Sequence, residues 1–440
     1  MIEDFGSPYP DTAEAFLTSL RSDALTGSIE VPGDKSISHR ALILGALAAG
    51  ETRISGLLEG DDVLHTADAV RAFGAEVEQV APGEWRVRGA EWRSPAGPLD
   101  CGNSGTGARL LMGASAGFSI TASFTGDSSL SSRPMQRVLD PLRAMGARTT
   151  GSRLPVTIEG GRLRGIRFVN EKASAQVKSA ILLAGLKAYG PVEVVEPRPS
   201  RDHSENMLRA FGCEIESGEG VVRLGERRTL RGTQIGVPGD PSSAAFPIVA
   251  ALLVPGSLVT VRNVMVNPLR TGLLGTLLEM GANLRLEREH VVGGERIADV
   301  TAAFSELRGV EVPAFRAPSM IDEYPILAIA AAFARGMTVM HGLAELRVKE
   351  SNRLAAIVAG LLACGVHARE EGDSLIVEGC AAAPPGGAEI RAGRDHRIAM
   401  SFLVMGLASQ KPVSVDSAEM IATSFPNFTP LMQSIGARIG

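Results

Sequence analysis

The stretch Val63–Val77, VLHTADAVRAFGAEV, shows the pattern from which the fold can be worked out. It reads as an amphipathic segment, a large apolar residue, a glycine and a strand-like run. The same pattern occurs six times, at Phe73-Gly74-Ala75, Met145-Gly146-Ala147, Phe211-Gly212-Cys213, Met280-Gly281-Ala282, Cys364-Gly365-Val366 and Ile435-Gly436-Ala437. A glycine there can adopt the left-handed conformation that ends a helix. The intervals of 72, 66, 69, 84 and 71 residues predict a βαβαββ-like repeat, used six times.

Each repeat holds an earlier helix candidate that is more uniformly apolar, so we expect it to be buried on all sides. The six segments are Ala41–Ala49, Ala108–Ala116, Val177–Leu186, Ala244–Leu253, Ile326–Ala334 and Ile398–Leu407. Most of them are followed by glycine or proline and then a β-branched strand, as in Gly50-Glu51-Thr52-Arg53-Ile54. This order predicts an α/β fold.

The chain also repeats on a coarser scale, because Val31-Pro32-Gly33-Asp34 recurs as Val237-Pro238-Gly239-Asp240. We interpret the two copies as hinge crossings, near 31–34 and 237–241, between two domains of three repeats each. One domain is expected over 33–238, and the other over 239–440 together with 26–32. Residues 1–25 are expected to form a loosely attached extension. A cleft between hinged domains is a common place for a ligand.

Composition narrows the functional class. The net charge of −5 disfavours nucleic acid as the main partner, although it allows a local basic pocket. The start, Met1-Ile2-Glu3-Asp4, is acidic where a signal peptide needs cations, and no apolar run is long enough for a membrane helix. The four cysteines form no CxxC pair, so neither a zinc site nor a disulfide framework is indicated. We therefore expect a cytoplasmic protein with reduced thiols, no metal, and neither nucleic acid nor membrane as a partner.

Chemistry-bearing residues gather where the predicted helices begin. Asp34–Arg40, Gly102–Gly107, Ser174–Gln176, Asp240–Ser243, Ile321–Glu323 and Asp395–Arg397 precede the six buried helices. Ser132–Pro134, Ser200–Asp202 and Lys349–Arg353 open later helices. Helix N-termini attract anions. The cations collected in this way are Lys35, Arg40, Arg133, Arg201, Lys349, Arg353 and Arg397, and they predict one strongly anionic site.

Each element alone has a plainer interpretation. Ser104–Gly107 lacks the Walker pattern and could be a structural turn, and Lys349-Glu350 could be a solvated helix face. Asp322 and Glu323 could simply cap a helix. The histidines at 39, 203 and 396 could cap or pack. Asp240–Ser243 carries no cation, and we assign it to the hinge. Only the repetition favours a functional site.

At these residues the chain resembles the 5-enolpyruvylshikimate-3-phosphate (EPSP) synthase family, from about Gly27 to the C-terminus. The motifs that carry the resemblance are Pro32–Arg40, Gly102–Gly107, Ser174-Ala175-Gln176-Val177-Lys178, Arg347–Ser351 and Asp395-His396-Arg397. The Ser-Ala-Gln-Val-Lys and Arg-Asp-His versions resemble a bacterial branch that includes glyphosate-tolerant members. The resemblance implies two domains of three βαβαββ repeats in pseudo-threefold arrangement, an inside-out α/β barrel.

The implied reaction moves the enolpyruvyl group of phosphoenolpyruvate onto the 5-hydroxyl of shikimate 3-phosphate by addition and elimination, the sixth step of chorismate synthesis. It needs no cofactor, and we expect a monomer. By resemblance, Asp322 takes the hydroxyl proton, Glu350 handles the CH₂/CH₃ proton, and Lys35 lies near the leaving phosphate. A carboxylate among cations suits a base, whereas Glu350 needs its pKa raised by burial or by the substrates' charge to act as an acid.

The resemblance also implies two sets of substrate ligands. Shikimate 3-phosphate would meet Lys35, Ser36, Arg40, Ser174, Ala175, Gln176, Arg201, Asp322 and Lys349. Phosphoenolpyruvate would meet Lys35, Gly105, Arg133, Gln176, Arg353 and Arg397, with Gly105 offering its backbone N–H.

Two positions depart from many family members. Thr423 stands where they have a lysine, and Ala175 stands where they have a second serine. Both departures fit the bacterial branch. Its tolerant members carry alanine at the position of Gly105, so we expect this chain to be glyphosate-sensitive, with an inhibition constant that is not far above the Michaelis constant for phosphoenolpyruvate.

Two alternatives stay open. The sister enzyme that transfers enolpyruvyl to UDP-N-acetylglucosamine usually carries a reactive cysteine in a mobile loop, but the matching region, Ser128–Arg133, has none. A non-catalytic anion-binding relative would be expected to lack Lys35, Asp322 or Glu350. Mutual repulsion of the seven cations also predicts a cleft that stays open until anions bind.

Overall fold

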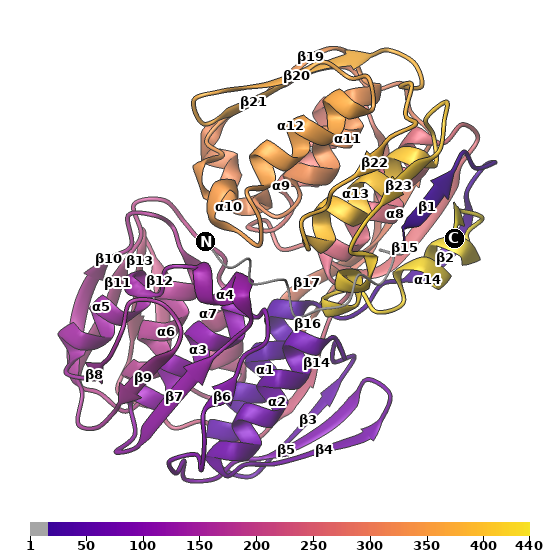
Figure 1. The fold of residues 1–440 in the computed structure, drawn as a ribbon. Helices are drawn as coiled ribbons and strands as arrows, with labels where there is room; N and C mark the ends of the chain where they lie inside the picture. Colours follow the sequence, from indigo (N-terminus) through magenta and orange to yellow (C-terminus); the bar gives the residue numbers. More distant parts are fainter. Residues whose placement is uncertain (1–15) are drawn as a thin grey trace, which may run out of the picture.

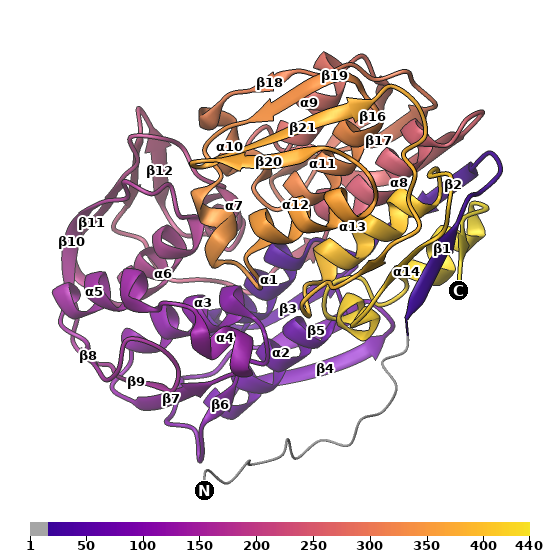
Figure 2. The ribbon, with the colours of Figure 1, turned by 45° about the horizontal axis from the view of Figure 1, so that its top comes forward.

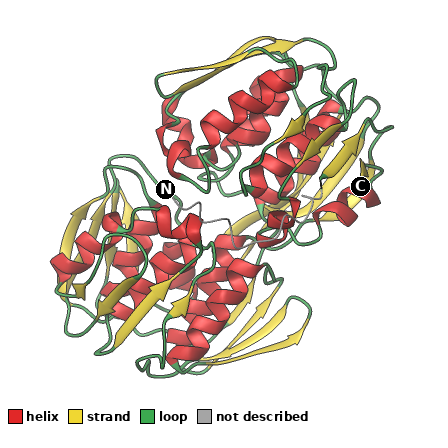
Figure 3. Cartoon of the chain, in the orientation of Figure 1, coloured by secondary structure: helices red, strands yellow, loops and turns green. Residues whose placement is uncertain are grey.

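The computed structural model describes residues 16–440, which form two lobes (Figure 1). In each lobe the helices lie inside and the sheets cover the outside (Figure 3). One buried apolar core is built from residues 37–235 together with Met265, and the other from residues 25–31 and 244–439. Among residues 16–440, no helix combines the length and the apolar character needed to cross a membrane.

Six four-stranded sheets share one topology, which confirms the predicted repeat. In the second repeat, β6 (Leu99–Asp100) pairs in parallel with β7 (Thr121–Thr125). The third strand along the chain, β8 (Arg148–Thr149), and the last, β9 (Val156–Glu159), form an antiparallel hairpin, and β9 pairs antiparallel with β7. Helices connect the first strand to the second and the second to the third, which is the βαβαββ order.

The first lobe holds three repeats. The first consists of β14 (Gln234–Gly236), α1 (Lys35–Leu47), β3 (Glu51–Ser55), α2 (Asp61–Phe73), β4 (Glu76–Ala81) and β5 (Glu84–Arg88). The second adds α3 (Gly105–Ala116), α4 (Ser128–Ser132) and α5 (Gln136–Met145) to β6–β9. The third consists of β10 (Arg164–Val169), α6 (Ala175–Gly185), β11 (Tyr189–Val195), α7 (His203–Ala210), β12 (Ile215–Gly218) and β13 (Val221–Leu224).

The second lobe holds the other three repeats. The fourth consists of β2 (Thr26–Glu30), α8 (Pro241–Leu253), β15 (Leu258–Met265), α9 (Gly272–Glu279), β16 (Asn283–Val292) and β17 (Glu295–Ala303). The fifth consists of β18 (Glu311–Val312), η1 (Ala314–Arg316), α10 (Ala317–Met320), α11 (Tyr324–Phe333), β19 (Arg335–Met340), η2 (Ala344–Val348), α12 (Arg353–Ala363), β20 (Ala368–Glu371) and β21 (Ser374–Cys380). The sixth consists of β22 (Glu389–Ile390), α13 (His396–Gly406), β23 (Val413–Val415), η3 (Ala418–Thr423), α14 (Phe428–Ser434), β24 (Arg438–Ile439) and β1 (Leu17–Leu20).

The six pattern glycines end the second helices as predicted. All six have positive φ, from 77° at Gly365 to 116° at Gly74. In this region a side chain would clash with the backbone, so glycine is the favoured residue. At Gly74 the backbone N–H returns to carbonyls of the last helical turn, and the chain then enters β4.

The more apolar helices are the buried ones. In the first lobe α1, α3 and α6 pack together, and in the second α8, α11 and α13 do. Contact between α3 and α6 depends on Gly113, where an added Cβ would lie 2.4 Å from the carbonyl oxygen of Ala180. All six of these helices begin two to six residues before the predicted segments, since their first turns were counted as loop. Except at α11, those first turns contribute residues to one cavity between the lobes.

The N-terminal region differs from the prediction of a loose extension. Residues 1–15 lie outside the described residues, but β1 pairs antiparallel with β23 and with β24. In the sheet of the sixth repeat β1 lies between β23 and β24, which is the position that β9 holds between β7 and β8 in the second repeat (Figure 2). Its backbone hydrogen bonds and the burial of Ser19 tie this segment to the second lobe.

The two Pro-Gly segments run side by side between the lobes. Gly33 and Gly239 form an antiparallel bridge, Asp34 N donates to Pro238 O at 2.7 Å, and Asp240 N donates to Pro32 O at 2.9 Å. Beyond them, β14 completes the sheet of the first repeat and β2 completes that of the fourth. We propose that these segments form the hinge.

Candidate functional site

One cavity of about 290 Å³ lies between the lobes and gathers residues from all six repeats. Of the fourteen residues predicted for catalysis or binding, thirteen line it. They are Lys35, Ser36, Arg40, Gly105, Arg133, Ser174, Ala175, Gln176, Arg201, Asp322, Lys349, Glu350 and Arg397. The fourteenth, Arg353, is fully buried and contacts two carboxylates of this cavity, Asp322 and Glu350.

Helix N-termini deliver many of these residues to the cavity. The first turns of α1, α3, α6 and α13 all contribute to its wall. Asp34 caps α1, Ser104 caps α3 and Asp395 caps α13, each side chain accepting a backbone N–H of the first turn. These caps fix the direction of the helix ends, so the partial positive charges of several helices converge on the cavity.

Arg133 reaches the cavity by a different route from the one predicted. It does not open a helix, because residues 128–132 form the short α4 and Arg133 is its C-cap, while α5 begins at Gln136. Its guanidinium donates to Asn103 Oδ1 at 2.5 Å and to Ser129 Oγ at 3.1 Å. Pro134 separates the two helices here, since it has no N–H to donate. The side chain is almost buried and is held from both sides.

Asp322 is the meeting point of the cations. Its carboxylate accepts from Arg201 Nη2 at 2.7 Å, Lys349 Nζ at 3.1 Å and Arg353 Nη1 at 3.4 Å. Burial alone would raise the pKa of Asp322, but the surrounding cations outweigh burial and hold that pKa well below its usual value. Asp322 is therefore a carboxylate at neutral pH. The plainer interpretation as a helix cap does not hold, because α11 begins at Tyr324 and its N-cap is Glu323.

Glu350 is also ionised. Burial raises its pKa, yet Arg353 and Arg133 hold the pKa well below the usual value for glutamate. Its carboxylate lies 2.5 Å from Arg353 Nη2 and 3.7 Å from Arg133 Nη1. The sequence analysis expected either burial or the substrates' negative charge to raise the pKa of Glu350. Burial is insufficient, so only the substrates' negative charge can raise it. Lys349-Glu350 is part of the cavity wall and not a solvated helix face.

Most of the seven predicted cations already pair with carboxylates of the protein. The expectation of an open cleft did not take these ion pairs into account. Lys35 pairs with Asp62 and Arg397 with Glu323. Two of the ion pairs that the seven cations make within residues 16–440 span the lobes, between Arg201 and Asp322 and between Arg133 and Glu350. A third joins Arg137 Nη1 to Glu345 Oε2 at 3.0 Å. Repulsion between cations is therefore offset within the protein, and the lobes are in contact.

Arg40 differs from the other six cations. Within residues 16–440 it makes no ion pair, and its guanidinium donates to Ser204 Oγ at 2.8 Å, Ser36 O at 2.9 Å and Ser179 Oγ at 2.8 Å. It is 4% exposed, and burial lowers its pKa to about 10. A buried arginine held only by neutral acceptors is suited to an anionic ligand.

Arg109 has a similar environment, and the sequence reasoning missed it. It donates to Gln176 Oε1 and to Pro134 O, and burial lowers its pKa to about 10. Gln176 in turn donates to Thr106 Oγ1 at 2.8 Å, which fixes the orientation of its amide. The signal was available, since Arg109 lies four residues after Gly105 and hence on the same face of α3. Within Ser104–Gly107, Ser104 caps α3 and residues 104–106 line the site.

Arg270 corrects the assignment of Asp240–Ser243 as a segment without a cation. Its Nη1 lies 3.0 Å from Asp34 Oδ2 and its Nη2 lies 3.3 Å from Asp240 Oδ1, so one guanidinium joins both crossing segments. Those carboxylates raise its pKa despite burial, which acts in the opposite direction. Arg270 precedes α9 as Arg201 precedes α7, so the repeat rule could have found it.

Replacing Arg270 by methionine is expected to lower the free energy of unfolding by about 3–5 kcal/mol, since two buried carboxylates lose their partner. Urea unfolding followed by circular dichroism measures this change. Arg262→Met is the control, because Arg262 and Glu30 form an exposed ion pair worth at most about 1 kcal/mol. Equal stability of the two variants would show that Arg270 does not hold the crossing.

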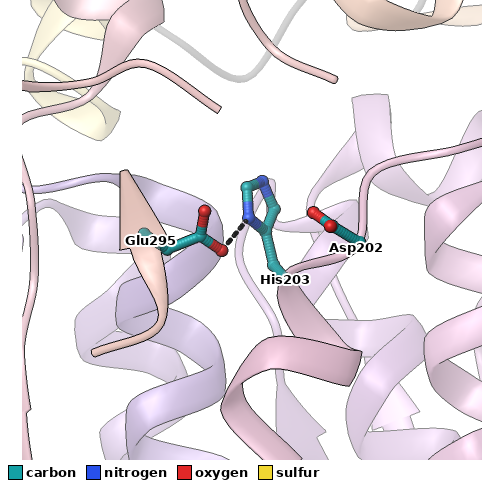
Figure 4. Close-up of side chains that lie close together, drawn as sticks. All are labelled: Asp202, His203 and Glu295. Carbon is teal, nitrogen blue, oxygen red and sulfur yellow. Dashed lines mark hydrogen bonds and ion pairs between the residues drawn. The ribbon is translucent and has the colours of Figure 1, made fainter. Parts of the chain in front are cut away.

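Beside Arg270, Asp202, His203 and Glu295 lie close enough to share a metal ion (Figure 4). Their ligand atoms already have partners. His203 Nδ1 bonds Glu295 Oε1 at 2.9 Å, and Asn267 Nδ2 donates to Asp202 at 2.7 Å and to Glu295 at 2.9 Å. Burial lowers the pKa of His203 to about 3. This geometry favours a hydrogen-bonded network that joins α7 to β17 across the lobes.

The other two candidate histidines, His39 and His396, are also neutral. His39 is fully buried between Thr66 Oγ1 and Ser104 Oγ, and burial lowers its pKa. His396 begins α13 at the cavity wall, and burial next to Lys35 lowers its pKa to about 3. The packing interpretation fits His39 and His203, whereas His396 lines the site.

The two positions that depart from many family members, Ala175 and Thr423, lie in different places. Ala175 lines the cavity as the first residue of α6. Thr423 does not line it, and its hydroxyl donates to Met420 O at 2.7 Å at the end of η3. The missing lysine is thus not replaced by another cation at that position.

Comparison with known proteins agrees with this arrangement. The sequence profile of the family "EPSP synthase (3-phosphoshikimate 1-carboxyvinyltransferase)" matches residues 21–432. The chain belongs to the EPSP synthase family. It is 57% identical over 437 residues to the 3-phosphoshikimate 1-carboxyvinyltransferase of Caulobacter vibrioides, covering 97% of this chain and 99% of that protein. The match to the Parvibaculum lavamentivorans enzyme of the same name is 58% over 433 residues, covering 96% of each chain.

Solved structures place the fold in the same family. The EPSP synthase of Acinetobacter baumannii superimposes with a TM-score of 0.87 at 44% identity, covering 97% of this chain and 99% of that one. An enolpyruvyl transferase of Streptomyces tendae, NikO, shares the fold with a TM-score of 0.78 at 20% identity, covering 97% and 98%. EPSP synthase membership therefore rests on the profile and on relatives that span nearly the whole chain.

Proposed function

We propose that this protein transfers the enolpyruvyl group of phosphoenolpyruvate to the 5-hydroxyl of shikimate 3-phosphate and releases phosphate. The observation that carries the proposal is the cavity, where Asp322 and Glu350 lie ionised among basic side chains. Eleven lysines and arginines and five carboxylates line this cavity. Two phosphorylated, carboxylate-bearing substrates carry a combined charge of about −5 to −6, which balances this excess.

Shikimate 3-phosphate is assigned to the side of the cavity formed by α1, α6 and the start of α7. Arg40 supports this assignment, because it is the one of the seven predicted cations that pairs with no carboxylate in residues 16–440. Ser174 is the N-cap of α6 and its side chain caps no backbone N–H, so its hydroxyl is available to a ligand. Arg201 and Lys349 would exchange their contacts with Asp322 for contacts with the substrate.

Phosphoenolpyruvate is assigned to the side formed by α3, Arg133 and α13. Gly105 begins α3, where anions are favoured, and its backbone N–H, which donates to Asn103 O at 3.0 Å in the free protein, would turn to the phosphate. Arg133 and Arg397 lie at the cavity wall, and Arg353 lies behind it. Arg109 holds the side chain of Gln176 between the two substrate sites.

The groups present can carry out addition and elimination. Asp322 takes the proton of the 5-hydroxyl as its oxygen bonds to C2 of phosphoenolpyruvate, and Glu350 donates a proton to the CH₂ carbon, giving a methyl group. The C–O bond to phosphate then breaks beside Lys35, and Glu350 recovers a proton from the methyl group to restore the double bond. Proton and electron counts balance without another reactant, because the proton that Asp322 has taken leaves with the released phosphate.

The experiment is a phosphate-release assay with purified protein, shikimate 3-phosphate and phosphoenolpyruvate. Sustained phosphate release that requires both substrates supports the proposal, whereas no release at saturating substrates rejects it. UDP-N-acetylglucosamine in place of shikimate 3-phosphate should be inactive. A thiol-blocking reagent should not abolish turnover, since no cysteine lines the cavity.

The proposal includes a monomer acting in the cytoplasm on small molecules, without nucleic acid or membrane. Both substrates are multiply charged and would cross a hydrocarbon layer only at high cost, so the reaction belongs where they are made. Each predicted contact comes from one chain. Size-exclusion chromatography with light scattering tests the monomer.

Gly105→Ala is expected to raise the Michaelis constant for phosphoenolpyruvate by about tenfold. An added Cβ would lie 3.1 Å from Arg109 Nη1 and 3.3 Å from Arg133 Nη1, so both guanidinium groups must shift. We expect the unsubstituted enzyme to be glyphosate-sensitive and the variant to be less so. Gly275→Ala is the control, because it meets open space. An unchanged Michaelis constant, or an unsubstituted enzyme that glyphosate barely inhibits, would contradict this prediction.

A further inference from the structure

Lys178 ends the motif that begins at Ser174, yet the proposed chemistry gives it no role. Its side chain is 1% exposed and does not line the cavity. Nζ lies 2.8 Å from Glu196 Oε2 and 2.7 Å from Glu205 Oε1, and it donates to Ser200 O at 3.4 Å. One buried ammonium group thus joins α6, the segment after β11, and α7.

Glu196 extends this contact to the start of α6. Its Oε1 accepts from Asn170 Nδ2 at 2.8 Å and from Ser200 Oγ at 2.6 Å. Asn170 also closes the turn before α6, since Ser174 N donates to Asn170 Oδ1 at 3.2 Å and Asn170 Nδ2 donates to Ser174 O at 3.1 Å. In that turn Ala173 has φ 49°, a left-handed conformation that its surroundings must hold in place.

Glu205 extends the contact toward Arg40. Its neighbour Ser204 accepts from Arg40 Nε at 2.8 Å and shares a 2.6 Å hydrogen bond with Ser179 Oγ. Both serines therefore orient the guanidinium of Arg40, and both lie on helices that Lys178 holds together, Ser179 on α6 and Ser204 on α7.

Stability alone is a weak reason for this arrangement. Burying one ammonium group with two carboxylates costs desolvation, and apolar residues of similar volume often replace such groups without loss. The three joined segments carry or orient proposed ligands of shikimate 3-phosphate. Ser174 and Gln176 lie at the start of α6, and Arg201 lies just before α7. Arg40 is oriented by the two serines on α6 and α7. Of the proposed phosphoenolpyruvate ligands only Gln176, which is assigned to both substrates, lies on a joined segment, and the others lie on other elements.

We infer that Lys178 is a positioning residue that, through Glu196 and Glu205, holds the segments binding shikimate 3-phosphate in their receptive geometry. It touches no substrate itself. The inference rests on the proposed function, because it names which substrate the network serves. Loss of the network should weaken binding of shikimate 3-phosphate and leave binding of phosphoenolpyruvate largely intact.

The test compares Lys178→Met with the matched control Lys187→Met, an exposed lysine just beyond the other end of α6. Calorimetry should show that Lys178→Met binds shikimate 3-phosphate at least about tenfold more weakly, with a matching rise in its Michaelis constant. The Michaelis constant for phosphoenolpyruvate, at saturating shikimate 3-phosphate, should change by less than about threefold. Lys187→Met should match the unsubstituted enzyme.

Two further variants keep the inference testable if Lys178→Met folds poorly. Lys178→Met/Glu205→Gln removes one of the two carboxylates that would otherwise repel each other, so it should regain part of the lost affinity. Asn170→Ala leaves the ion pairs intact and cuts only the link between Glu196 and Ser174, so it should weaken shikimate 3-phosphate selectively, with a smaller loss of stability than Lys178→Met.

The outcomes separate this inference from the proposed function. If the unsubstituted enzyme neither binds shikimate 3-phosphate nor releases phosphate, the proposed function fails. If it does both, and Lys178→Met and Asn170→Ala bind shikimate 3-phosphate unchanged, or weaken both substrates equally while lowering the melting temperature, the inference fails.

Discussion

Replacing Asp322 by asparagine is expected to lower kcat by about 10²–10⁴-fold while shikimate 3-phosphate still binds. Asparagine keeps the shape of the side chain but cannot take the proton of the 5-hydroxyl. In the free enzyme the carboxylate of Asp322 contacts both Arg201 and Lys349. The neutral asparagine would no longer compete with the anionic substrate for these two cations. Affinity for the anionic substrate should therefore stay the same or increase.

The same contacts suggest how the base becomes active. Arg201 and Lys349 are proposed ligands of shikimate 3-phosphate and also hold the pKa of Asp322 low, against the effect of burial. When the substrate takes these two cations, the pKa of Asp322 rises and the carboxylate becomes a stronger base. In the free enzyme the pKa is depressed, so loss of the base form is expected only below about pH 4.

Steady-state phosphate release gives kcat for Asp322→Asn, and calorimetry gives its affinity for shikimate 3-phosphate. Asp68→Asn serves as the control, because Asp68 forms an exposed ion pair with Arg71 on α2, outside the cavity. A kcat within about twofold of the unsubstituted enzyme would remove the role assigned to Asp322.

Glu350→Gln is the second change with a large expected effect, again about 10²–10⁴-fold in kcat. Glutamine fills the same space but cannot pass a proton to the CH₂ carbon. In the free protein burial raises the pKa of Glu350, but Arg353 and Arg133 outweigh it, and the group is ionised. The negative charge of bound substrates must therefore raise the pKa before Glu350 can act as an acid.

This requirement has a definite pH dependence. Because the protonated form starts the reaction, kcat should fall as pH rises through the pKa of Glu350 in the complex. The slow residual turnover of Glu350→Gln should lack that decline. In deuterated water the unsubstituted enzyme should place deuterium in the CH₂ group of the product, and the variant should do so far more slowly. Glu371→Gln, in an exposed pair with Arg369, is the control. Equal deuterium uptake by the variant and the unsubstituted enzyme would exclude Glu350 as the proton carrier.

Much of the fold could be predicted from local patterns. The glycines at 74, 146 and their four equivalents end helices because positive φ is a property of a single residue, and the apolar helices are buried because their whole circumference is apolar. The repeat then brought thirteen predicted residues to one cavity. Arg109 and Arg270 were missed although the repeat could have shown them, whereas β1 had no local signal, because its partners β23 and β24 lie about 400 residues away.

The sequence by itself determined the six repeats, the convergence of helix N-termini and the excess of cations, since spacing and residue type are read along the chain. Only the tertiary structure decided which charges meet. Arg201 and Asp322 are 121 residues apart, Arg270 reaches back to Asp34, and Lys178 pairs with Glu196 and Glu205. The reason is physical: the energy of a charge depends on its distance to partners and its burial in three dimensions, and neither quantity is written in the order of residues.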